Sequence, residues 1–192
     1  MKTLNLDKPL LFSSDDHYLC KDVDLDEWPH YFNTRKLHDM KSYIKANKEL
    51  PGTYQLSLIK TRRALANSGL PHARRYALHL NTWIDPTLVG EVEAFANRYE
   101  NVSRFGLEAQ CVWGAHWEKH HPDTKWISYS FDSKVRSVND ALRKIKRNLP
   151  AFSTSPSAES KPEFMQWMNN YYVGASKWEK TDEVVVQNNQ EE

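Results

Sequence analysis

The chain has 192 residues, of which 40% are hydrophobic and 12% aromatic, and its formal net charge is +1. This composition predicts a globular domain with a real core and excludes an intrinsically disordered chain. The only two cysteines, Cys20 and Cys111, are far apart in the sequence, which argues against a disulfide scaffold and a thiolate zinc site. Without an apolar run long enough to span a bilayer or a charged-then-apolar leader, we expect a cytoplasmic protein with no membrane contact.

Charged residues are segregated along the chain. Seven acids and two bases lie between Asp7 and Glu27, whereas five bases and no acid lie between Glu49 and Asp85. A second basic stretch, 134–147, holds six bases and one acid. We therefore expect an acidic face and a basic face on the folded protein.

The first 70 residues are expected to form an acidic arm and a helical extension. Residues 1–33 are irregular, acidic and aromatic. Apolar residues at helical spacing predict a helix that begins near Asn33 and ends before Pro51-Gly52. A second helix is predicted for 53–67, although the alternation of its first residues also fits a strand.

Residues 71–150 are expected to form the α+β core. Strict alternation predicts a strand over 75–84, and Asp85-Pro86 then predicts the start of a helix that runs toward Gly106. The stretch 111–131 is interpreted as a hairpin of two strands, followed by a helix that Asp132 or Ser133 caps and Pro150 ends. This order predicts a ferredoxin-like β-α-β-β-α layer with one open sheet face.

The C-terminal part is expected to be a linker followed by a helix. Residues 151–162 are rich in serine and predict a linker. Residues 163–192 are expected to form a helix and a tail that pack on the core, with Glu183–Gln187 as a short strand.

The 111–131 stretch holds candidate metal ligands. On a strand, His116 and Glu118 would point to the same side, with His120 or His121 from the turn as a third ligand and His79 from the neighbouring strand as a further one. A divalent metal is the only cofactor that this pattern suggests. The alternative is a solvated, histidine-rich turn.

Basic and aromatic residues form a candidate nucleic-acid surface. Clustered bases neutralise phosphates, and aromatic rings on an open sheet face stack with bases. The alternative is a solvated helix face, with the tryptophans covered by the N-terminal arm. The candidates are Arg62, Arg63, Arg74, Arg75, Trp83, Trp126, Arg143, Lys144 and Arg147.

Two adjacent tyrosines near the C-terminus, Tyr171 and Tyr172, are candidate nucleophiles, and Lys177 follows them. A tyrosine hydroxyl attacks phosphorus when a metal or a cation lowers the cost of its ionisation. The alternative is that the tyrosines continue a core stripe with Phe164 and Met168.

The order of strand, helix, hairpin, helix and tyrosine helix over residues 75–177 resembles that of rolling-circle replication initiators of the HUH class, above all those of filamentous phages and prophages. Val112-Trp113 and the tyrosines match the pattern of that family, whereas Trp126-Ile127-Ser128 stands where its His-hydrophobic-His motif would be. The resemblance implies a mobile-element protein that binds DNA or RNA, and the missing motif implies an inactive relative of an initiator. If the chain is an enzyme, the resemblance implies a metal-dependent tyrosine nuclease.

The competing expectation is a protein-interaction or inhibitor module. In that case a protein partner would dock on the acidic arm and on exposed tryptophans, since tryptophan and arginine dominate interface hot spots.

Overall fold

The computed structural model describes residues 8–12, 17–20, 28–78, 80–99, 106–129, 134–149 and 151–172. It is a mixed α+β structure, as predicted. The helices of the described part are α1 (Met40–Asn47), α2 (Thr53–Asn67), α3 (Val89–Tyr99, after a 3-10 turn at Pro86–Leu88), α4 (Ala109–His120), α5 (Val138–Lys146), α6 (Pro156–Glu159) and α7 (Pro162–Tyr171). None of them is long and apolar enough to cross a bilayer.

The strands that the structure describes form three small sheets. One pairs β1 (Leu10–Phe12) with β5 (Thr82–Ile84), and the second has the order β2 (His17–Leu19), β8 (Ala151–Thr154), β7 (Lys134–Val135). The third has the order β4 (Arg74–Arg75), β3 (His30–Lys36), β6 (Trp126–Tyr129), and its β3 and β6 run parallel. The single ferredoxin-like layer is therefore not confirmed.

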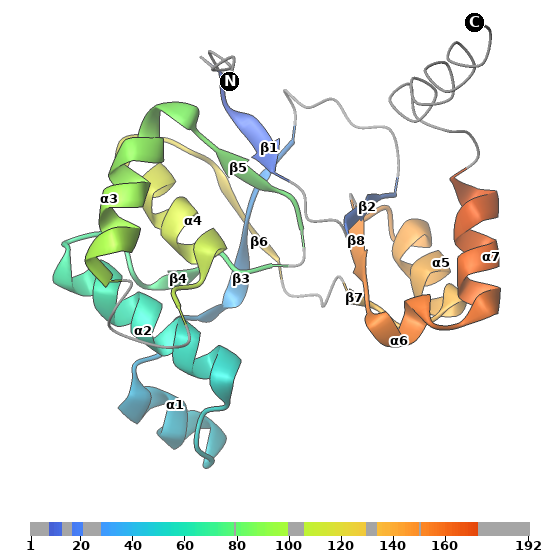
Figure 1. Cartoon of the computed structure of the whole chain (residues 1–192), viewed down its shortest axis with the longest axis horizontal. Helices are drawn as coiled ribbons and strands as arrows, with labels where there is room; N and C mark the ends of the chain where they lie inside the picture. Colours follow the sequence, from blue (N-terminus) through green and yellow to red (C-terminus); the bar gives the residue numbers. More distant parts are fainter. Residues whose placement is uncertain are drawn as a thin grey trace, which may run out of the picture.

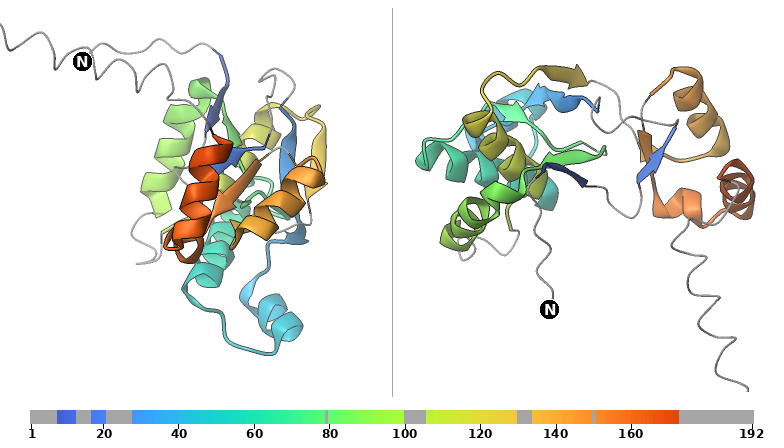
Figure 2. Two further views of the ribbon diagram at one scale, coloured as in Figure 1. Left: turned by 90° about the vertical axis from the view of Figure 1, so that its right-hand side faces the viewer. Right: turned by 90° about the horizontal axis from the view of Figure 1, so that it is seen from above.

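Figure 1 shows the elements gathered in two groups. The sheets of β3 and β5 lie with α2, α3 and α4 on one side, and α1 extends below them. The sheet of β8 lies with α5, α6 and α7 on the other side, as the view from above in Figure 2 also shows. A cluster of buried residues joins the two groups, because it holds Trp28 and Tyr129 from the first and Ala151 from the second.

Helix α4 is the central helix of the first group. Six of its residues are buried, among them Cys111, His116 and Trp117. The predicted hairpin over 111–131 is therefore wrong: its first half is this helix, and only Trp126–Tyr129 is a strand. The alternation was misleading because the helix is buried on most of its sides and thus has no clear 3.6-residue pattern.

Other predicted elements are confirmed or shifted. The helix at 53–67 has the predicted bounds, and the helix after Asp85-Pro86 is also confirmed. The helix predicted from Asn33 begins only at Met40, where the Asp39 side chain accepts a hydrogen bond from the backbone N–H of Ser42. The strand predicted over 75–84 is present only at its two ends, β4 and β5.

The C-terminal part departs from the predicted linker. All four residues of β8 are buried between β2 and β7, and α6 follows directly. In α7, Phe164 and Met168 are buried, as predicted. The proposed caps Asp132 and Ser133 and the predicted strand 183–187 lie outside the described residues; Ser137 caps α5.

Gly114 sets the distance between α4 and the chain that follows β4. A Cβ atom at this position would overlap the ring of Tyr76, whose side chain is buried. We expect Gly114→Ala to lower the free energy of unfolding by about 1–3 kcal/mol, because the packed ring must be displaced. Urea unfolding followed by circular dichroism measures this change.

Gly90→Ala is the matched control. Gly90 lies in α3, and no atom lies within 4 Å of an added Cβ. Alanine there should leave stability unchanged or raise it by up to about 1 kcal/mol, through its higher helix propensity. Equal effects of the two substitutions would contradict the role given to Gly114.

Candidate functional site

Three potential metal ligands meet where α3 and α4 pack side by side. Glu91 comes from the first turn of α3, and His116 and His120 lie four residues apart on α4, so both histidines face the same direction. One ligand atom from each side chain lies within 4.8 Å of the others. Nδ1 of His116 is 3.2 Å from Oε1 of Glu91, and Nε2 of His120 is 2.7 Å from Oε2.

His116 is the unusual member of this cluster. His116 is only 1% exposed, and neither nitrogen of its ring has a hydrogen-bond partner among the described residues. The contact with Glu91 is close enough for an ion pair but is not aligned as a hydrogen bond. Burial lowers the pKa of the imidazole, which favours its neutral form. A buried polar group without a partner costs about 1–3 kcal/mol, so this ring is held at an energetic cost.

The predicted metal trio is not brought together. His79 lies outside the described residues. On the helix, Glu118 points away from His116, and its carboxylate accepts hydrogen bonds from Nη1 of Arg74 at 2.7 Å and from the Tyr76 hydroxyl. His121, the other candidate from the turn, lies 2.9 Å from Asp85. Of the residues proposed as ligands, His116 and His120 therefore share a site.

Sequence reasoning missed Glu91. The helix of Glu91 was predicted correctly, but its position beside His116 depends on the packing of α3 against α4. The signal available in the sequence was the spacing of His116 and His120, which is that of one helix face.

Arg74 and Arg75, both predicted to bind phosphate, are half-buried and engaged within the protein. The Arg74 guanidinium forms the ion pair with Glu118 and lies 5.2 Å from the ring centroid of Phe32. The Arg75 guanidinium lies 5.6 Å from the ring centroid of Tyr54 and donates a hydrogen bond to its hydroxyl. These arginines hold β4 against its neighbours.

The stretch of chain that contains these arginines is nevertheless strongly basic. Residues 34–75, which we call the basic segment, hold ten lysines and arginines but only two acids, Asp39 and Glu49. Nη1 of Arg62 lies 3.6 Å from Oδ2 of Asp39, and the Arg63 side chain is exposed. The helix α1 in this segment buries no residue and carries the exposed Lys41 and Lys45 at one-face spacing, and the exposed Lys48 follows as its C-cap; we call these three residues the lysine stripe.

The second predicted basic patch, on α5, is smaller than expected. Lys144 is buried, and only Arg143 and Arg147 of the predicted bases are exposed. The Arg143 guanidinium pairs with Asp140 at 3.2 Å.

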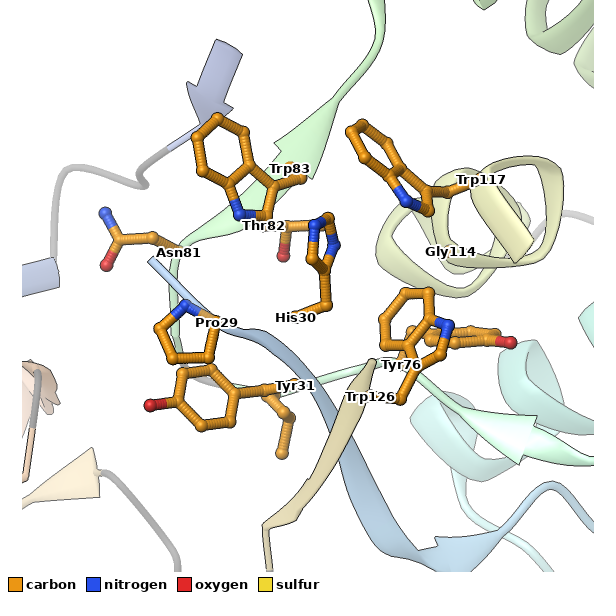
Figure 3. Close-up of a pocket in the computed structure, with 11 residues that line it drawn as sticks. Pro29, His30, Tyr31, Tyr76, Asn81, Thr82, Trp83, Gly114, Trp117 and Trp126 are labelled. Atoms are coloured by element: carbon orange, nitrogen blue, oxygen red, sulfur yellow. The ribbon is translucent and has the colours of Figure 1, made fainter. Parts of the chain in front are cut away.

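Trp83 and Trp126, predicted as base-stacking residues on an open sheet face, instead pack into an aromatic cluster. Figure 3 shows the His30 ring pointing into the space among Trp83, Trp117 and Trp126. The ring centroids of these tryptophans lie 5.8, 4.6 and 5.3 Å from that of His30. The cavity beside them measures about 20 Å³, which is room for about one water molecule and not for a base.

Tyr171 and Tyr172 act as anchors in the structure. Their hydroxyls donate hydrogen bonds to the backbone carbonyls of Cys20 at 3.2 Å and Leu19 at 2.7 Å, which ties the end of α7 to β2. Burial raises the pKa of Tyr172, the opposite of what a nucleophilic tyrosine requires. Lys177 lies outside the described residues.

Comparisons with protein-family models, characterised proteins and solved structures find no match.

The aromatic cluster predicts a specific pH dependence of stability. Burial, with a smaller contribution from His121, lowers the pKa of His30 to about 4 in the folded protein. Between this value and the ordinary pKa of about 6.5, the unfolded chain binds a proton that the folded chain does not, so stability falls as the pH is lowered. We expect the free energy of unfolding of His30→Phe to fall less than that of the wild type when the pH is lowered from about 7.5 to about 5.

Urea unfolding at both pH values measures this difference. At the higher pH, His30 is neutral in both states, so the comparison there reports the change in packing alone. An equal loss of stability on acidification in the two proteins would contradict the assignment to His30.

The tyrosine anchors give a second prediction. Tyr172→Phe removes one hydrogen bond to the Leu19 carbonyl and should lower the free energy of unfolding by about 0.5–1.5 kcal/mol. Gln166→Ala on the exposed side of α7 is the control and should change it little. Equal stability of Tyr172→Phe and the wild type would show that the hydroxyl is not an anchor.

Proposed function

We propose that the protein binds nucleic acid through the basic segment, residues 34–75. The observation that carries the proposal is the charge of this folded stretch, ten bases against two acids. The other 150 residues hold 16 of the 26 bases and 23 of the 25 acids, so the near-neutral net charge conceals a strongly basic region. A polyanion is the natural partner of such a region.

The placement of the bases supports contact with a phosphate backbone. Lys41 and Lys45 share one side of α1, Lys48 caps its C-terminal end, and the helix extends from the rest of the protein in Figure 1. Arg35 and Lys36, at the end of β3, are also exposed. Each lysine or arginine that meets a phosphate releases counterions, which makes binding dependent on salt.

Tyr54 supplies an aromatic ring within the same segment. It lies in the first turn of α2 and is 47% exposed, and the Arg75 guanidinium lies over its ring. A ring backed by a cation and open to solvent suits stacking with an unpaired base, which favours single strands as the partner. Tyr54 takes the role that the sequence had suggested for Trp83 and Trp126.

The proposal includes binding without cutting, as expected of an inactive relative of a replication initiator. The tyrosines that would attack are tied to β2 at the end of α7. The histidine–glutamate cluster lies on α3 and α4, in the other group of elements (Figure 1). A tyrosine nuclease needs both at one place. Cys20 and Cys111 are buried thiols and not parts of a disulfide, which suits the cytoplasmic location that we infer for such a protein.

A protein partner is the second candidate, on a surface other than the predicted one. The acidic residues of the arm lie outside the described part, and every tryptophan within it is buried or half-buried. Exposed apolar side chains are instead found on and after α1, namely Met40, Ile44 and Leu50, which is 81% exposed. Binding of a protein through these apolar side chains would depend less on salt than binding to a phosphate backbone does.

The proposed function predicts the effect of removing the lysine stripe. The triple variant Lys41→Gln, Lys45→Gln, Lys48→Gln keeps helix-forming residues and removes three charges. In fluorescence-anisotropy titrations of labelled single-stranded and double-stranded DNA and RNA across a salt series, the wild type should bind more weakly as salt rises. The slope of log K against log[salt] should be about 2–3 smaller in the variant.

The control removes three exposed bases outside the segment, through Arg98→Gln, Lys125→Gln and Lys161→Gln. It should keep the slope of the wild type, and circular dichroism should show both variants folded. No binding by the wild type at low salt, or binding to anionic vesicles alone, would contradict the proposed function. Equal slopes for the two variants would place the binding surface elsewhere.

A further inference from the structure

We propose that Glu91, His116 and His120 form a binding site for a divalent transition metal of the zinc type. The site is independent of the nucleic-acid proposal, because none of its ligands lies in the basic segment. It rests on three features of the described residues: the convergence of three ligand atoms, the buried imidazole of His116, which meets Glu91 without an aligned hydrogen bond, and a cation already bound to Glu91.

The geometry suits a small metal ion. Ligand atoms about 2.1 Å from a tetrahedral ion lie about 3.4 Å from one another. The two measured contacts to Glu91 are 3.2 and 2.7 Å, and all three ligand atoms fall within 4.8 Å. Rotation of the exposed side chains, which moves their ligand atoms by about 1 Å, would bring the distances between ligand atoms close to this value. The two histidines already lie on one helix face.

The His116 side chain is the observation that points to a ligand. It is buried, and its ring edge packs against Phe95 with the centroids 5.4 Å apart, so the ring is held in place. Both of its nitrogens are without a hydrogen-bond partner among the described residues, and Nδ1 faces the Glu91 carboxylate. A metal ion at this point would accept the lone pair of one nitrogen, which the protein itself leaves unused.

The site already attracts a positive charge. Nζ of Lys119, which is exposed, lies 2.7 Å from Oε1 of Glu91, the oxygen that also faces His116. We infer that this ammonium group competes with the metal ion and swings into solvent when the ion binds. Its four-carbon stem allows this movement without a change in the backbone.

The ligand set decides the class of metal. Two imidazoles and one carboxylate suit Zn²⁺, Co²⁺ and related first-row ions, whereas Mg²⁺ and Ca²⁺ prefer sites made of oxygen atoms. Three protein ligands leave one coordination position open. Because His120 is exposed, this position faces solvent at the surface between α3 and α4.

Titration of the metal-free, full-length chain with Zn²⁺ tests the proposal by calorimetry. Co²⁺ is the second probe, because it shows visible absorption when nitrogen and oxygen ligands enclose it. We expect one equivalent of Zn²⁺ to bind. Loss of a residue that only supports a metal ligand lowers the affinity for the metal by about 10–100-fold. Loss of a ligand itself should cost more, so His120→Ala and Glu91→Gln should each lower the affinity for Zn²⁺ by at least about 100-fold. Both residues are partly exposed, so the variants should fold, and thermal unfolding without metal verifies this.

His121→Ala is the matched control, because this adjacent histidine faces Asp85 and not the cluster. It should bind Zn²⁺ as the wild type does. Lys119→Gln should strengthen binding by up to about fivefold, since it removes the competing ammonium group. If His116 and His120 only paired with Glu91 and held no metal ion, Lys119→Gln would not strengthen the binding of Zn²⁺.

Two results would overturn the proposal. One is that the wild type binds no Zn²⁺ at concentrations up to about 0.1 mM, well above the dissociation constants of dedicated zinc sites. The other is that His120→Ala and His121→Ala weaken binding equally, which would mean that the ion is held by scattered surface histidines.

Discussion

The first group of elements depends on the burial of α4. Gly114 allows the helix to approach the ring of Tyr76, and the tyrosine hydroxyl in turn bonds with Glu118 one turn further along. With this side of the helix fixed, the opposite side must face α3, which carries His116 toward Glu91. The close contact between Gly114 and Tyr76 thus places Glu118 beside hydrogen-bond donors and turns His116 toward α3.

The same helix connects the aromatic cluster with the polar cluster. Trp117, the residue after His116, packs against His30 and against His121, with centroids 4.6 and 4.5 Å apart. Its indole N–H donates to the hydroxyl of Thr124, so the turn after α4 is held as well. Because β6 begins just after this turn and pairs with β3, the position of α4 also sets the parallel strand pair.

The sequence predicts elements whose signals are local and misses those that depend on distant contacts. The bounds of α2 are predicted by residues at its two ends, Thr53 at its start and Gly69 just past its last residue. Burial on most sides removed the periodicity from α4, so the alternation of its tryptophans was taken for a strand. The serine-rich stretch after Pro150 could not reveal that β8 is the middle strand of a sheet, because its partners β2 and β7 lie elsewhere in the chain.

The candidate sites divide in the same way. Charge is a property of the sequence itself, so the sequence predicts a basic region. It also predicts phosphate contacts for Arg74 and Arg75, which in the structure contact Glu118 and Tyr54. The metal ligands required the helical state of α4: on a strand His116 pairs with Glu118, and on a helix it pairs with His120.

This change of state also separates the candidate metal cluster from the arrangement that the HUH pattern implied. That pattern implied ligands on a strand that act together with a tyrosine. The candidate ligands instead lie between two helices, and the tyrosine hydroxyls bond with the chain at β2. An ion at this position would first of all join α3 to α4, and with them the aromatic cluster on which His30 depends. The nucleic-acid binding that we propose would need neither the ion nor the tyrosines, because Lys41 and Lys45 lie on a helix that buries no residue.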